Sequence, residues 1–224
     1  PSSLIDSGAD ILMFGMGEHQ AVEIAKLLKK GRPVSTIRDI PGISYKIPEN
    51  KLKLTDFVEC PSFEEVSRTD FEGKKKYAES CRIQQDEFDA VRGKTVLQKH
   101  GDYYVVQNPP SPPLTTEELD EVYELPYERN YHPSYEKLGG VPGITEVKFS
   151  ITHNRGCFGA CNFCSLAYHQ GRMISARSEE SVIREAIKLT EMKDFKGYIH
   201  DVGGPTAVFT HPKCKKQAEQ GLCK

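Results

Sequence analysis

The chain has no tryptophan, no apolar run long enough to span a membrane and no marked excess of either charge. A membrane span needs about 18 consecutive apolar residues, and the sequence does not open with a signal-peptide pattern. Lysine and arginine number 30 against 32 aspartates and glutamates, so no polyanionic partner is indicated. Seven cysteines without a secretory signal favour a reducing compartment and metal ligation over disulfides. We expect a cytoplasmic protein with no membrane partner and no indicated nucleic-acid partner.

The 224 residues allow one large domain or two small ones. Residue 1 is a proline rather than a methionine, and the last residues, 213–224, stop inside a segment rich in cysteine and lysine. We interpret the chain as part of a longer protein.

Three cysteines stand close together in Cys157-Phe-Gly-Ala-Cys161-Asn-Phe-Cys164. Each thiolate of this C-x3-C-x2-C spacing can hold one iron of a cubane [4Fe–4S] cluster, which leaves the fourth iron without a protein ligand. Electron-transfer clusters use four cysteines, so a set of three leaves a coordination position open for chemistry. Gly156 and Gly159 would let the backbone wrap closely around such a group.

Two other interpretations of the three cysteines are open. A zinc site normally needs four ligands, often as two C-x2-C pairs, and only Cys161 and Cys164 form such a pair. An inert cysteine cluster is the second alternative, although three cysteines within eight residues, among glycines, do not resemble a core pattern.

The N-terminal part predicts an α/β unit. Residues 11–14 form a short apolar strand, a Gly15-Met-Gly17 turn follows, and a helix is expected over residues 19–30, ending at Gly31. Its predicted inward stripe consists of Ala21, Ile24, Ala25 and Leu28. The third glycine of a dinucleotide-binding loop is missing, so a structural turn is the preferred interpretation of the glycine pair.

Capping boxes at Ser62-x-x-Glu65 and Thr115-x-x-Glu118 predict two short helices. A longer helix is expected from Thr69 or Asp70 to about Arg92, and residues 95–99 and 103–107 predict a β-hairpin. The proline-rich stretch 108–113 is the best boundary in the chain. We therefore predict an N-terminal α/β region (1–107), a connector (108–143) and a third region (144–224).

The third region reads as the opening of a parallel barrel. Val147, Phe149 and Ile151 alternate with polar residues as in a strand, and the cysteine loop follows the carboxyl end of that strand, where barrel enzymes keep their chemistry. Ser178 caps a helix with a predicted buried face, and residues 198–202 form the second strand, ending at Gly203-Gly204. The buried face of the helix is predicted to be Val182, Ile183, Ala186, Ile187 and Leu189.

Several stretches resemble the YgiQ-type branch of the radical S-adenosylmethionine (radical-SAM) superfamily. They are Asp10-Ile-Leu-Met-Phe-Gly-Met-Gly-Glu18, Val106-Gln-Asn-Pro-Pro110, Glu124-Leu-Pro-Tyr127, Arg155 through Cys164, His169-Gln-Gly-Arg172, Ala176-Arg-Ser178 and His200 through Ala207. The resemblance implies a (β/α)6 partial TIM-like barrel, of which about two β/α units are present. We expect this chain alone to be inactive.

The resemblance implies that Cys157, Cys161 and Cys164 ligate a [4Fe–4S] cluster and that S-adenosylmethionine (SAM) binds its open iron. Phe163, Gly203 and Gly204 are candidate cofactor contacts, although Pro205 replaces the acidic residue of the family's Gly-Gly-Glu segment. His169, Arg172 and Arg177 could orient SAM or a substrate carboxylate; a structural hydrogen-bond network is the alternative. His153 and Arg155, just before the motif, are expected to be surface residues.

The implied reaction is reductive cleavage of SAM to a 5′-deoxyadenosyl radical, which acts on an unknown substrate with a reductant such as flavodoxin or ferredoxin. No catalytic residue is assigned, and cobalamin is unsupported because Asp-x-His-x-x-Gly is absent. Two rival functions stay open: an iron–sulfur electron carrier or structural metal-binding domain without SAM chemistry, and an RNA-modifying radical-SAM enzyme.

Four cysteines lie outside the motif. Cys60 and Cys81 have no ligand spacing and are expected to be small core residues. Cys214 and Cys223 stand among lysines, which favour the thiolate, and are candidate ligands of an auxiliary cluster or zinc site completed by cysteines beyond Lys224. Two exposed thiols are the alternative.

Overall fold

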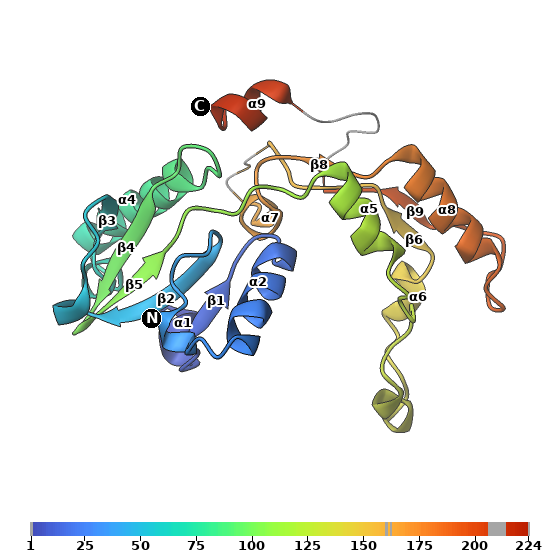
Figure 1. The fold of residues 1–224 in the computed structure, drawn as a ribbon, viewed down its shortest axis with the longest axis horizontal. Helices are drawn as coiled ribbons and strands as arrows, with labels where there is room; N and C mark the ends of the chain where they lie inside the picture. The colour runs from blue at the N-terminus through green and yellow to red at the C-terminus, as the bar shows by residue number, and fades with distance from the viewer. Residues whose placement is uncertain (1, 160, 162, 206–213, 224) are drawn as a thin grey trace. The chain divides into compact units, whose positions relative to one another are not determined.

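The computed structural model describes residues 2–159, 161, 163–205 and 214–223 (Figure 1). The chain divides into two compact units. The first combines Pro1–Pro112, Asn162–Arg172 and Lys215–Lys224, and the second combines Pro113–Cys161 and Met173–Cys214. Within the described part, no helix is both long and apolar enough to cross a membrane.

A five-stranded mixed sheet forms the centre of the first unit, in the order β1-β2-β5-β4-β3. Its strands are β1 Ile11–Met13, β2 Ile43–Pro48, β3 Phe57–Cys60, β4 Thr95–His100 and β5 Tyr103–Gln107. β3 pairs with β4 in parallel, and the other pairs are antiparallel. The predicted strand at residues 11–14 and the predicted hairpin at 95–107 are confirmed as β1 and as β4 with β5.

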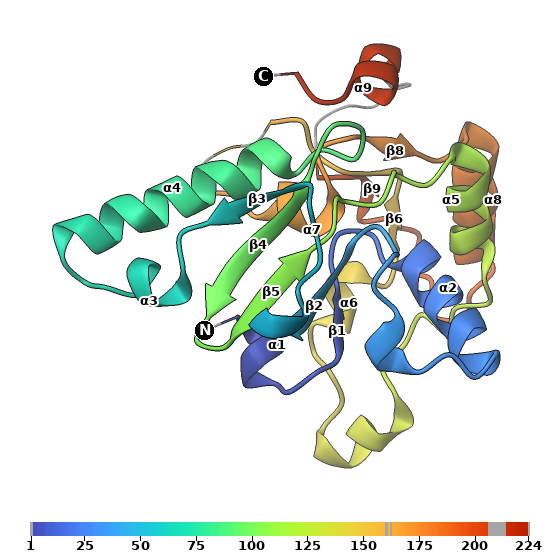
Figure 2. The ribbon, with the colours of Figure 1, turned by 60° about the vertical axis from the view of Figure 1, so that its left-hand side comes forward.

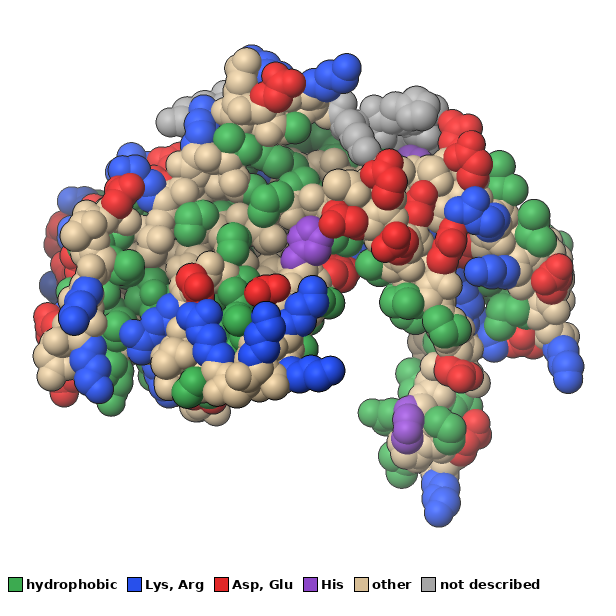
Figure 3. All heavy atoms as spheres, viewed as in Figure 1, with side chains coloured by type: hydrophobic (Ala, Val, Ile, Leu, Met, Phe, Trp, Pro, Cys, Tyr) green, Lys and Arg blue, Asp and Glu red, His purple; other side chains and the backbone are tan. Residues whose placement is uncertain are grey.

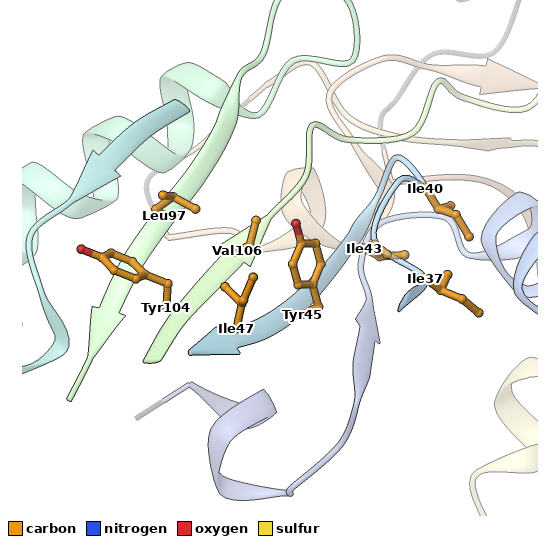
Figure 4. Packing of buried hydrophobic residues seen from close by; sticks show 8 residues of the cluster. All are labelled: Ile37, Ile40, Ile43, Tyr45, Ile47, Leu97, Tyr104 and Val106. Carbon is orange, nitrogen blue, oxygen red and sulfur yellow. The ribbon is translucent and has the colours of Figure 1, made fainter. Parts of the chain in front are cut away.

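One face of this sheet carries the main apolar core (Figure 4). Side chains alternate across a strand, so every second residue of β2, β4 and β5 reaches this face. The segment before β2 adds two isoleucines. The buried cluster consists of Ile37, Ile40, Ile43, Tyr45, Ile47, Leu97, Tyr104 and Val106.

Helix α2 (Glu18–Lys29) follows the predicted strand and turn, but it presents a different face to the core. Ile24 and Leu27 pack against the cluster, and Gln20 is fully buried. Ala21, Ala25 and Leu28 are exposed, so the predicted stripe was wrong except at Ile24. Successive residues of a helix are rotated by 100°, so Gln20, Ile24 and Leu27 lie on one face. Because glutamine is polar, the spacing of apolar residues does not indicate that this face is buried.

The remaining helices of the first unit are short, apart from α4. They are α1 Ser3–Asp6, α3 Phe63–Val66, α4 Phe71–Glu87, α7 Leu166–Gln170 and α9 Lys215–Gln220, with 3-10 turns at Val34–Thr36 and Glu49–Lys51. The capping box at Ser62 is confirmed, and Asp70 caps α4, which ends earlier than predicted. α4 lies along β3 and β4 (Figures 1 and 2).

Two later segments of the chain pack on the end of α4. Phe88 contacts Tyr168 of α7 with ring centroids 5.2 Å apart. The buried Asp89 carboxylate accepts a hydrogen bond of 2.9 Å from the Leu222 backbone N–H. The first unit is therefore completed by residues that lie far from its sheet in the sequence.

The second unit contains two small sheets and the helices beside them. β6 (Ser150–Thr152) pairs in parallel with β9 (Asp201–Gly203), and β7 (Asn154–Arg155) pairs antiparallel with β8 (Ser175–Ala176). The helices are α5 Thr116–Glu124, α6 Ile144–Val147 and α8 Glu179–Thr190, with a 3-10 segment at Pro133–Leu138. Thr115 forms the predicted capping box of α5, and Ser178 caps α8.

The predicted first barrel strand was too long, because Val147 lies in α6 and the strand begins at Ser150. The second strand likewise begins at Asp201 rather than at residue 198. β6, α8 and β9 form one parallel β-α-β unit. The described residues contain no closed barrel, so the α/β class is confirmed and the barrel stays a prediction.

Candidate metal and cofactor site

The loop after β7 brings two of the three cysteine sulfurs to one glycine. The Gly159 N–H donates to Cys157 Sγ at 3.4 Å, and Cys161 Sγ donates to the Gly159 carbonyl at 3.9 Å. A Cβ built on Gly159 would lie 3.4 Å from one sulfur and 3.7 Å from the other. A side chain at this position would contact both sulfurs, so the glycine leaves a sulfur-lined space open.

Gly156 fixes the start of this loop. Its φ of +88° is in the left-handed region, and a Cβ there would lie 2.1 Å from the Met173 carbonyl oxygen. Both conditions require glycine. Gly156 therefore allows the segment just before β8 to pack closely on the loop; whether the glycines let the backbone wrap around a cluster stays a prediction.

The backbone of His153 joins the elements around the loop. Its N–H donates to the Gly203 carbonyl at 2.7 Å, and its carbonyl accepts from the Arg177 N–H at 3.0 Å. His153 and Arg155 are of intermediate exposure. Arg155 donates to the Tyr123 hydroxyl at 3.1 Å, and its guanidinium lies 5.0 Å from the centre of that ring.

Gly203 and Gly204 differ in what surrounds them. A Cβ on Gly203 would meet only the Asp201 carboxylate, at 3.3 Å, whereas one on Gly204 would lie 2.4 Å from the Asn154 side-chain oxygen and 2.5 Å from its backbone oxygen. The close packing on Asn154 is thus enough by itself to require a glycine at position 204. Asn154 is 1% exposed, and its Nδ2 has no hydrogen-bond partner in the described structure.

Sequence reasoning passed over Asn154, because an asparagine before a loop reads as an ordinary polar residue. A buried amide donor without a partner is costly. An acceptor oxygen brought by a bound molecule would satisfy it, so the surroundings of Asn154 are chemically suited to a ligand that carries a carboxylate.

Arg177 is held in an internal network rather than left available for a ligand. Its side chain is fully buried and donates to the Thr152 carbonyl at 3.0 Å, to the Ser181 hydroxyl at 2.8 Å and carbonyl at 3.0 Å, and to Glu185. Burial lowers the pKa of its guanidinium. The structural-network interpretation of Arg177 is the one that these contacts support.

This network also explains why the predicted buried face of α8, right at Leu189, was wrong at Ile183 and Ile187. The residues of this helix that are fully buried are Ser181, Glu185 and Leu189, whereas Ile183 and Ile187 are more than half exposed. Ser181 and Glu185 turn inward because they satisfy the buried guanidinium of Arg177. Val182 and Ala186 lie at intermediate exposure.

The other candidate residues after the loop lie in the first unit. Cys164 is half-buried, Phe163 is 92% exposed and His169 is exposed. Arg172 is half-buried, and its Nε has no hydrogen-bond partner in the described residues. Two residues of the motif, Ala160 and Asn162, lie outside the described part of the chain, as do Thr206 and Ala207.

The described residues contain no group of three His, Cys, Asp or Glu side chains able to hold one metal ion. A cluster makes a different demand, because each thiolate binds a different iron and the sulfurs need not converge on one point. Three thiols are a suitable donor set for such a group, and two of the sulfurs lie close to Gly159. Ligation by Cys157, Cys161 and Cys164 stays a prediction.

The cysteines outside the motif are all free. Cys60 is buried as predicted, and burial raises the pKa of its thiol, which makes it a poor ligand. Cys81 is exposed, so its predicted core position was wrong. Cys214 and Cys223 are also exposed, residues 206–213 and 224 lie outside the described part, and the auxiliary metal site stays a prediction.

A family model described as "Radical SAM N-terminal" matches residues 1–150. The chain belongs to this radical-SAM family. The match ends just before the cysteine motif, so it rests on the N-terminal α/β unit and the connector and is independent of the three cysteines.

Similarity to known proteins extends over the whole chain. A UPF0313 protein of Clostridium botulinum (strain 657 / Type Ba4) is 56% identical over 223 residues, which cover 100% of this chain and 34% of that protein. A UPF0313 protein of Clostridium perfringens (strain ATCC 13124) is 52% identical over the same share of this chain and 33% of its own length. The chain thus spans about a third of these relatives. No solved structure matches it.

Proposed function

We propose that this chain provides the N-terminal region and the cluster-binding loop of a radical-SAM enzyme of unassigned substrate. Cys157, Cys161 and Cys164 would hold a [4Fe–4S] cluster. When bound, cluster and SAM supply the one-electron cleavage that yields a 5′-deoxyadenosyl radical. The observation that carries the proposal is the sulfur-lined space at Gly159 in a chain of the radical-SAM family.

The cysteine loop would supply both the ligands of the cluster and a hydrogen-bond donor to one of them. The thiols of Cys157 and Cys161 both lie close to Gly159, and the backbone N–H of that glycine donates to Cys157. Hydrogen bonds to cluster sulfurs adjust the reduction potential. The loop therefore supplies both ligands and one means of setting the potential at which an external reductant would deliver its electron.

SAM would be positioned by groups close to the loop. Gly203 has no Cβ, and a Cβ built there would meet no backbone atom, so a ligand would be able to approach its backbone closely. The unsatisfied Nδ2 of Asn154 would donate to a carboxylate oxygen. Arg177 would not contact SAM itself. Its hydrogen bonds would instead hold the Thr152 carbonyl and the start of α8 in position.

The test is anaerobic reconstitution of a protein extended to the full length of its relatives. We expect a brown iron–sulfur species whose electron paramagnetic resonance spectrum changes when SAM is added, and 5′-deoxyadenosine after reduction with dithionite. A cluster whose spectrum ignores SAM would indicate the electron-carrier function instead. A preparation that binds no iron would overturn the proposal.

A further inference from the structure

A pocket of about 400 Å³ lies in the second unit, between the end of α5 with the residues just after it and one side of α8. α5 and α8 lie side by side (Figures 1 and 2). Apolar walls come from Leu125, Pro126, Leu189 and Met192. The pocket shares no residue with the cysteine loop, so ligand binding there does not depend on a cluster.

The charges that line this pocket are unequal. Arg129, Arg177, Arg184 and Lys188 are positive, whereas Glu124 and Glu185 are negative. Arg184 is paired with Glu124 at the rim. Lys188 has no ion-pair partner among the residues that the structure describes.

Glu185 is shared by two arginines. It pairs with Arg177 and also with Arg129, and its own side chain is 7% exposed. One carboxylate balances one guanidinium, so these three side chains together carry one excess positive charge, which the nearby Asp120 and Glu124 carboxylates offset only in part. Burial lowers the pKa of both guanidinium groups, which reflects how poorly the cations are solvated there. A buried excess charge is costly until an opposite charge joins it.

Arg129 is the arginine of this pair that has N–H donors without a hydrogen-bond partner among the described residues. It donates to the Lys148 carbonyl at 3.1 Å and pairs with Glu185, and it makes no further hydrogen bond to the described residues. A guanidinium has five N–H donors. Its side chain is 23% exposed, whereas that of Arg177 is fully buried and has its donors engaged.

The backbone at Arg129 is also unusual. Its φ of +50° makes it the one non-glycine residue with positive φ in the described structure. Such a conformation is unfavourable for a residue with a Cβ, and its persistence points to a function for the side chain. Neutralising Glu185 does not explain it, because Arg177 already does so.

Acidic side chains gather over α5 next to the pocket (Figure 3), and two of them are already engaged. Asp120 accepts from the Ser178 N–H and hydroxyl at the start of α8, and Glu124 holds Arg184. Neither carboxylate bonds to Arg129, so its remaining donors are available to an incoming anion.

We propose that this pocket binds a small organic carboxylate, with the carboxylate on Arg129 and an apolar body against Leu125, Leu189 and Met192. The planar guanidinium fork matches a carboxylate, one negative charge balances the buried excess, and Lys188 at the rim attracts the anion. The apolar wall distinguishes this ligand from inorganic phosphate.

The test uses the protein extended to the full length of its relatives and measures binding by isothermal titration calorimetry. Hexanoate is the probe, 1-hexanol the uncharged control and inorganic phosphate the bare anion. We expect saturable binding of hexanoate, and affinities of hexanol and phosphate at least about tenfold weaker, as for loss of a charge-assisted bond or of the apolar contact.

Matched variants locate the site. Arg129→Gln should weaken hexanoate binding at least about tenfold, whereas Arg184→Gln, which removes the same charge from an exposed pair, should change it less than about threefold. Arg129→Lys keeps the charge beside Glu185 and should bind hexanoate several-fold more weakly than the parent protein. If Arg129→Gln does not fold, the Arg129→Lys variant still tests whether the guanidinium binds hexanoate.

Three results would overturn the proposal: no saturable hexanoate binding, equal binding of hexanol or phosphate, or equal affinities in the parent protein and the Arg129 variants that fold.

Discussion

Gly204 packs directly on Asn154: a Cβ at Gly204 would lie 2.4 Å from the asparagine Oδ1 and 2.5 Å from its backbone oxygen. The contact joins the end of β9 to the start of the cysteine loop. The second glycine of the pair is therefore needed for the fold, whereas the first is free of backbone obstruction.

This difference separates folding from cofactor binding. Gly204→Ala should lower the free energy of unfolding by about 1–3 kcal/mol, the usual cost of overpacking. Gly203→Ala should change it by less than about 1 kcal/mol, because the Asp201 side chain can move aside. The measurement is urea unfolding followed by circular dichroism.

For SAM binding we expect Gly203 to be the more sensitive of the two glycines. Gly203→Val in the extended protein should weaken SAM binding while iron content stays near that of the parent protein, because a side chain would cover the backbone edge. Equilibrium dialysis with SAM and an iron assay measure both quantities. Unchanged SAM affinity would remove Gly203 from the site.

The three motif cysteines should behave as one unit. Replacing Cys157, Cys161 or Cys164 singly by serine should abolish the brown absorbance and most of the bound iron after reconstitution, because each thiolate holds its own iron. Cys81→Ser is the matched control, since Cys81 is exposed and outside the motif. A motif variant that kept full iron content would show that its cysteine is not a ligand.

Glu185 should contribute far more to the free energy of unfolding than Glu124, an exposed carboxylate that lines the same pocket. Glu185→Gln leaves two guanidinium groups without their shared counter-charge and should cost about 3–5 kcal/mol of unfolding free energy. Glu124→Gln breaks only the exposed pair with Arg184 and should cost at most about 1 kcal/mol. Equal losses in denaturant titrations of the two variants would contradict the buried network.

Acid should release the segment around Leu222. Burial acts to raise the pKa of Asp89, but hydrogen bonds from the Val91, Leu222 and Arg92 N–H groups outweigh it and leave the pKa below its usual value of 3.8. A carboxyl with a depressed pKa stabilises the fold above 3.8 and loses that contribution as pH falls through its own lower pKa.

Asp89→Asn should therefore be less stable than the parent protein at pH 7, and the difference should shrink as the pH falls below 3.8. Hydrogen exchange of the Leu222 amide measures the local effect, which should be faster in the variant at neutral pH. An exchange rate that matches the parent protein would show that Asp89 does not hold this segment.

Local signals predicted local structure well. Capping boxes at Ser62 and Thr115, the cap at Ser178 and the hairpin over residues 95–107 depend on contacts a few residues apart, and the structure bears them out. Predictions failed where distant residues decided the outcome, as at α2, whose inward face includes Gln20, and at Val147, which lies in a helix rather than a strand.

The sequence alone determined the chemical inventory: three cysteines at C-x3-C-x2-C spacing, a glycine between the first two, and a glycine pair after the second predicted strand. Only the tertiary structure decided what each residue does with its neighbours. Arg177 is occupied because Ser181 and Glu185 of α8 and Thr152 of β6 converge on it, and Arg129 keeps free donors because Glu185 is already shared. Residue type sets which bonds a side chain can make, but burial and the distances between elements decide which of them form.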